Sequence, residues 1–126
     1  METPKWADTE LSTNLPIIRE AGESDSVDFK ETFPEDARRL AKTLAAFGTS
    51  GGGDVIIGID DNGDLVGIDS QTADARDACF ERVHGIASTV RPVLKVDLFF
   101  AVESEKTVLL IRICTFGKNG RRPWIN

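Results

Sequence analysis

The sequence is poor in cysteine and histidine, the residues that form disulfides and bind zinc. Its 126 residues contain two cysteines, one histidine, one methionine and no tyrosine. Cys79 and Cys114 each lie in an apolar stretch without CxxC spacing and without a neighbouring histidine. We therefore expect two buried small hydrophobic residues in a reducing compartment, not a disulfide or a metal centre.

Long hydrophobic runs are also absent. No apolar run approaches the roughly 18 residues of a membrane-spanning helix, and the acidic N-terminus lacks the basic region followed by an apolar one that marks a signal peptide. These absences argue against a membrane protein and predict a cytoplasmic location. A length of 126 residues with 40% hydrophobic content is enough for one globular domain with its own core.

Positive charge is scarce in the first part of the chain and concentrated in the last part. Residues 1–81 hold 7 Lys and Arg against 18 Asp and Glu, whereas residues 82–126 hold 8 against 3. A basic face can bind phosphates locally even when the net charge is −6. The candidate phosphate contacts are Arg91, Lys95, Arg112, Lys118, Arg121 and Arg122, and the Trp124 ring beside the last three could stack on a base or fill a core position. The alternative is an uneven but merely solvated surface.

The hydrophobic periodicity predicts an arm over residues 1–13 and a single domain over residues 14–126. Three helices are predicted: a short one closed by Gly22, one from Thr32–Glu35 to Gly48 and one over about 75–90. A single strand is predicted over 27–31. Two hairpins are predicted, one of strands 54–59 and 64–68 and one of strands 94–102 and 107–114. This order predicts an α+β fold with a mixed, mainly antiparallel sheet of about five strands and two main helices on one face.

The glycine run from Gly48 to Gly53 resembles a phosphate-binding loop only superficially. A P-loop follows a strand, precedes a helix and carries a Lys, whereas this run follows a helix, precedes a strand and has no Lys after it. We predict a tight packing turn, with nucleotide binding as the less favoured alternative.

Several spaced motifs resemble the Schlafen AlbA domain family. They are Glu23-Ser, Asp28-Phe-Lys, Ala45-Ala-Phe-Gly-Thr-Ser-Gly-Gly, Ile57-Gly-Ile-Asp-Asp-Asn-Gly and Val66-Gly-Ile, in the family's order. The resemblance covers residues 23–69 by motif and the rest by element order. It implies a DNA- or RNA-binding module that is common in bacteria and archaea.

In animal Schlafen proteins, a similar core cuts tRNA and rRNA with three acidic residues and a divalent metal. Carried over by motif, these acids and metal ligands are Glu23, Asp28 and Asp60, with Asp61 as the substitute for Asp60. The second acid is usually Glu, so Asp28 is shorter than the family pattern, and the usual Arg-containing strand after the proline is missing or differently built. From the residues alone, these acids can equally be a solvated strand edge and turn residues.

Two functions of different classes follow. The first is a nucleic-acid-binding domain without a cofactor, and the second is an endoribonuclease that requires Mg²⁺ or Mn²⁺. A protein-interaction or oligomerisation module is a further alternative. A homodimer is also predicted, because an uncovered sheet face would expose Phe99, Leu109, Ile111 and Ile113.

Overall fold

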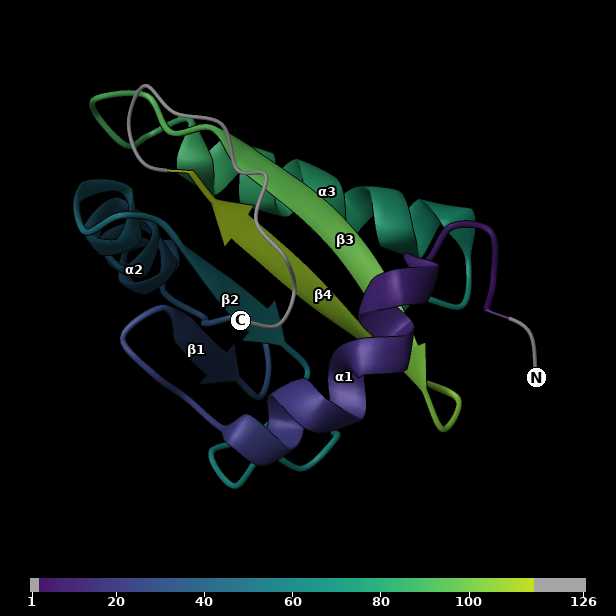
Figure 1. Ribbon diagram of the computed structural model, residues 1–126. Helices are drawn as coiled ribbons and strands as arrows, with labels where there is room; N and C mark the ends of the chain where they lie inside the picture. The colour runs from purple at the N-terminus through teal and green to yellow at the C-terminus, as the bar shows by residue number, and fades with distance from the viewer. Residues whose placement is uncertain (1–2, 115–126) are drawn as a thin grey trace.

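The structure, a computed structural model that describes residues 3–114, is built from three helices and a four-stranded sheet (Figure 1). In chain order the elements are α1 (Thr9–Ala21), β1 (Val27–Lys30), α2 (Ala37–Thr49), β2 (Gly53–Ile57), α3 (Ala73–Ala87), β3 (Val96–Glu103) and β4 (Lys106–Ile113). The strand order is β1-β2-β4-β3; β1 and β2 are parallel and the other two pairs are antiparallel. No helix in this part of the chain is long and apolar enough to cross a membrane.

Helices cover both faces of the sheet. Leu109, Ile111 and Ile113 of β4 belong to the hydrophobic cluster beneath α2 and α3, whereas Val108 and Leu110 belong to the cluster beneath α1. In Figure 1, α1 lies in front of the sheet and α3 lies behind it. The expectation of helices on one face is therefore wrong, because a strand that is apolar at nearly every position has to be covered on both sides.

The same arrangement removes the reason given for a homodimer. Leu109, Ile111 and Ile113, which were expected on an uncovered face, are fully buried within the chain, and Phe99 packs partly buried against the α1 cluster. The homodimer remains a prediction without this support.

The α+β class and the mixed sheet are confirmed, but the sheet has four strands rather than about five. The second hairpin forms as β3 and β4, while residues 64–68 of the first predicted hairpin are not a strand. Only Ile59 and Leu65 form a bridge there, after which the amide of Ile68 donates to the carbonyl of Thr107 at 2.9 Å. The segment leaves its partner because β4 already occupies the edge of β2 next to it.

Two helices begin at residues other than those predicted. Asp36 rather than Thr32 caps α2, and its side chain accepts from the Arg38 amide. Phe33, ahead of the cap, packs against the core and lies under the Arg82 guanidinium. Asp8 caps α1 by accepting from the Leu11 amide at 2.7 Å. Residues 9–13, expected to belong to an arm, are therefore the first turns of a helix.

The glycine run is a packing turn, as predicted. The Gly52 amide donates to the carbonyl of Phe47 at 2.8 Å, which closes the C-terminus of α2. A Cβ added to Gly53 would lie 2.5 Å from the Phe47 ring, so only glycine allows β2 to start this close to the helix.

A buried ion pair joins the two central strands. Arg112 of β4 donates from Nε and Nη2 to the two carboxylate oxygens of Asp54 in β2, at 2.9 and 3.0 Å. Arg112 and Asp54 are register partners, and the side chain of Arg112 is only 5% exposed. Such a two-point contact fixes the register of β2 against β4.

We expect Asp54→Asn to lower the free energy of unfolding by about 3 kcal/mol, because it removes the carboxylate that forms a two-point contact with the buried Arg112 charge. Urea unfolding measures the change. The control is Arg38→Ala, which breaks an exposed pair with Asp36 and should cost at most about 1 kcal/mol. Equal effects of the two substitutions would contradict a structural role for the buried pair.

Candidate functional site

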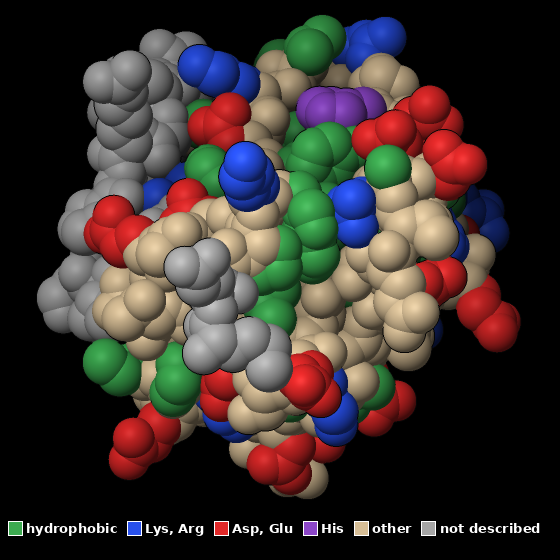
Figure 2. All heavy atoms as spheres, turned by 90° about the vertical axis from the view of Figure 1, so that its right-hand side faces the viewer, with side chains coloured by type: hydrophobic (Ala, Val, Ile, Leu, Met, Phe, Trp, Pro, Cys, Tyr) green, Lys and Arg blue, Asp and Glu red, His purple; other side chains and the backbone are tan. Residues whose placement is uncertain are grey.

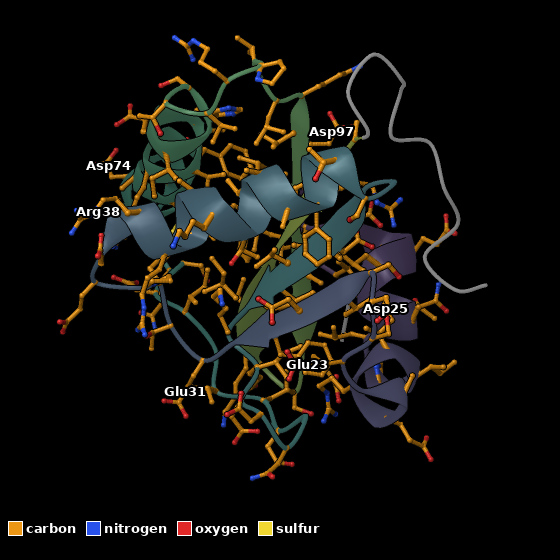
Figure 3. The ribbon with its side chains drawn as sticks, turned by 90° about the vertical axis from the view of Figure 1, so that its left-hand side faces the viewer. Glu23, Asp25, Glu31, Arg38, Asp74 and Asp97 are labelled. Carbon is orange, nitrogen blue, oxygen red and sulfur yellow. The ribbon has the colours of Figure 1, made fainter. Side chains whose placement is uncertain are left out.

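Two acidic side chains, Glu23 and Asp28, interact at the outer edge of β1. Figure 3 labels Glu23 beside this strand. Glu23, just before the strand, accepts a hydrogen bond from the Phe29 amide at 3.1 Å. A hydrogen bond with the Asp28 carboxyl raises the pKa of Glu23, and burial and the charges of Asp28 and Asp61 raise it further. These effects together outweigh the hydrogen bond from the Phe29 amide, which lowers the pKa. The structure thus brings together the first two residues of the predicted acidic trio.

The third predicted acid has another role. Asp60 Oδ1 accepts hydrogen bonds from the amides of Asn62 and Asp64, both at 2.9 Å, and so organises the turn after β2. This turn is fastened to the end of α1, where Arg19 donates to the carbonyl of Gly63 at 3.0 Å and pairs with Glu103. The substitute residue, Asp61, is the one whose charge acts on Glu23.

The predicted metal ligands therefore do not fit a three-carboxylate site. Glu23 and Asp60 each use a carboxylate oxygen on backbone amides, and Asp28 forms an ion pair with Lys30 at 2.9 Å. Within residues 3–114, no group of three His, Cys, Asp or Glu side chains is arranged to hold a metal ion. Hard divalent cations need several free oxygen ligands at one point, and this edge does not offer them.

A basic hollow lies beside the acidic pair. It has a volume of about 540 Å³ and is lined by Lys30, Pro34, Arg39, Lys42 and Thr43. Lys30 comes from the end of β1, and the other two cations come from successive turns of α2. Three positive side chains from two elements thus converge on one concave surface.

Sequence reasoning missed this hollow because the first 81 residues are acidic overall. The available signal was local: Arg39 and Lys42 are three residues apart and fall on the same side of a helix. Lys30 joins them only because β1 and α2 are neighbours in the fold. Net charge summed over a long segment conceals such a cluster.

The structure places the predicted nucleic-acid contacts of residues 82–126 in different environments. Arg91 and Lys95 are exposed, and Arg91 donates to the carbonyls of Ser88 and Val90 at the end of α3. Arg112 does not reach the surface as predicted, because it is held in the buried pair with Asp54. The remaining four, Lys118, Arg121, Arg122 and Trp124, lie outside the described residues.

Comparison with known families gives one match. The sequence profile of the Schlafen AlbA_2 family matches residues 23–119. This range contains the acidic pair, the basic hollow and the whole of the sheet. A comparison with curated protein sequences found no match.

Among solved structures, the chain is similar to the DIP2311 protein from Corynebacterium diphtheriae. The TM-score is 0.49 with 21% sequence identity. The similarity covers 86% of this chain and 23% of the DIP2311 chain. The chain thus corresponds in length to less than a quarter of that protein.

We expect Asp28→Asn to lower the pKa of Glu23 toward its ordinary value. In the native protein the raised pKa means that the folded state binds more protons than the unfolded state, so the free energy of unfolding falls as the pH rises from about 4.5 through the folded pKa. Asp28→Asn should weaken this pH dependence. Carboxyl NMR titration of Glu23 checks the shift, with Asp25→Asn in the adjoining turn as the control. A Glu23 pKa that is the same in Asp28→Asn and native protein would contradict the interaction.

Proposed function

The chain belongs to the Schlafen AlbA_2 family, and on this basis we propose that it is a nucleic-acid-binding domain. The observation that carries the proposal is the hollow in which Lys30, Arg39 and Lys42 converge. Ammonium and guanidinium groups grouped on a concave surface neutralise phosphates and release condensed counterions. Binding through such contacts fixes the position of the backbone without reading its sequence.

The acidic pair, Glu23 and Asp28, supports the same proposal because it restricts where the sugar–phosphate backbone of a nucleic acid can lie. Asp28 pairs with Lys30 at 2.9 Å and contacts the carboxyl of Glu23, so negative charge adjoins the hollow on one side. A phosphate chain is repelled from that edge and attracted to the side formed by α2, where Arg39 and Lys42 lie. The exposed Arg91 and Lys95, together with Lys118, Arg121 and Arg122, are proposed to extend the contact.

We expect Arg39→Ala combined with Lys42→Ala to weaken binding to single-stranded DNA and RNA without preference for sequence. Removing two phosphate contacts should reduce the slope of log affinity against log salt concentration by about 2. Gel shifts or fluorescence anisotropy at several salt concentrations measure this slope.

The matched control is Arg38→Ala, which removes a neighbouring α2 cation that is not part of the hollow and is paired with Asp36. It should leave the slope nearly unchanged. A second variant, Lys118→Ala with Arg121→Ala and Arg122→Ala, tests the contacts proposed for the C-terminal segment. If neither multiple variant changes the slope, the proposed phosphate contacts are wrong. No gel shift of any nucleic acid at low salt would favour a protein-interaction module.

The endoribonuclease remains a second candidate only because two of the three proposed acids, Glu23 and Asp28, adjoin the basic hollow. Incubation with tRNA and Mn²⁺ tests it directly. If the activity exists, Glu23→Ala and Asp28→Ala should each abolish cleavage, and Asp61→Ala should lower it more than Asp60→Asn does. Cleavage that persists in both Glu23→Ala and Asp28→Ala belongs to a contaminant or another site and removes this candidate.

A further inference from the structure

A second hollow of about 500 Å³ opens beside the N-terminal end of α3. Its lining includes Trp6, Val66, Ile68, Ser70, Val102 and Thr107. The volume lies within the range of about 300–1,000 Å³ that is usual for small-molecule sites. Figure 2 views the protein from this side and shows hydrophobic side chains gathered along the middle of the face, with Lys and Arg on both flanks.

Trp6 forms an aromatic wall of this hollow. The Arg76 guanidinium lies 4.4 Å from the ring centroid, and the ring meets Phe100 edge-on with centroids 5.7 Å apart. Arg76 is itself held by donating to the carbonyl of Ser70 at 2.7 Å. The indole is thus fixed in orientation, yet Trp6 remains 36% exposed. A rigid ring that is still open to solvent is suited to stack on another ring.

Two hydroxyl groups in the lining have no partner within the described part of the chain. Ser70 and Thr107 are 5% and 7% exposed, and neither side chain takes part in a hydrogen bond among residues 3–114. No fully enclosed side-chain oxygen or nitrogen in the same range lacks a partner, so both hydroxyl oxygens must reach open space. Both residues line the hollow. Each hydroxyl can donate or accept a hydrogen bond there.

The charges around the hollow select against an ion. Glu105 and Lys106 contribute one charge of each sign, and the Lys106 ammonium donates to the carbonyl of Leu65 at 3.3 Å. Arg76 over the Trp6 ring opposes a cation at that ring. The lining therefore suits an uncharged, flat molecule with hydrogen-bonding groups on its edge.

We propose that this hollow binds a nucleobase, which stacks on Trp6 and forms edge hydrogen bonds with the Ser70 and Thr107 hydroxyls. The base can come from a free nucleoside or from a single strand. Aromatic side chains bind bases of single strands by stacking, with little sequence preference.

The sheet topology favours a base that belongs to a single-stranded nucleic acid. This form of the inference rests on the proposed nucleic-acid-binding function. Strands β1, β2 and β3 all point the same way, so Lys30 at the end of β1 and Val102 near the end of β3 lie at one end of the sheet. Val102 and Ile68 pack against the cluster beneath α2 and α3, the face on which the cations of α2 also lie. Neighbouring β-strands lie about 4.8 Å apart, so the edge strands β1 and β3, with β2 and β4 between them, are about 14 Å apart. A strand of a few nucleotides can place a phosphate in the basic hollow and a base against Trp6.

The test uses the fluorescence of Trp6 in the 126-residue chain carrying Trp124→Phe, so that Trp6 is its sole indole. Adenosine, guanosine, cytidine and uridine are titrated separately, and a 12-nucleotide single strand is titrated at low salt. We expect saturable quenching. Thr107→Val and Ser70→Ala should each weaken binding by about fivefold, the usual effect of losing one hydrogen bond. The control is Thr13→Val on α1, whose hydroxyl donates to the carbonyl of Thr9 and which should change nothing.

The outcomes separate this inference from the proposed function. If the strand gives a gel shift while neither nucleosides nor the strand quench Trp6, the base site is wrong and nucleic-acid binding stands. Quenching that is equal in the Trp124→Phe protein with and without Thr107→Val or Ser70→Ala also overturns the base site. Quenching by nucleosides that both variants weaken, without any gel shift by the strand, supports the base site and overturns the proposed function.

Discussion

Strands β2 and β4 have to be shielded from water on both faces, and the rest of the structure follows from this requirement. Nearly every residue of β4 is buried, so helices must cover the sheet on two sides rather than one. The Arg112–Asp54 pair locks the register between these two strands. With the centre occupied in this way, β1 and β3 become the edges of the sheet, and both candidate binding hollows lie beside these edges.

The acidic residues near β1 show how one residue type can serve structure and chemistry at once. Glu23 accepts from the outward amide of Phe29, which protects a short edge strand from pairing with another chain. Asp60 similarly satisfies two amides of a turn. The raised pKa of Glu23 follows from the position of Asp28 beside it and from the charge of Asp61. Glu23 and Asp28 are close together, but Glu23 and Asp60, two of the three predicted ligands, already accept hydrogen bonds from backbone amides.

The two hollows differ in the chemistry that they offer, although they share one end of the sheet. The hollow beside β1 presents three cations, which suits phosphate. The hollow beside β3 presents an indole and two hydroxyls without a hydrogen-bond partner among residues 3–114, and its charge is balanced, which suits a neutral ring. The loop between β2 and α3 runs between them and contributes Val66, Ile68 and Ser70 to the second hollow. The first hollow thus suits the phosphates of a single strand and the second suits one of its bases.

The family, the α+β class, the β3–β4 hairpin and the packing role of the glycine run could be predicted from the sequence, because each depends on residues that are close together in the chain. The sequence could not determine that residues 64–68 would fail to form a strand, since the edge they needed is taken by β4, more than 40 residues later. Nor could it place Lys30 beside Arg39 and Lys42, bury Arg112 against Asp54, or bring Trp6 to Ser70 and Thr107. Those contacts join distant segments, and only the stacking of helices on both faces of one sheet decides which distant side chains meet.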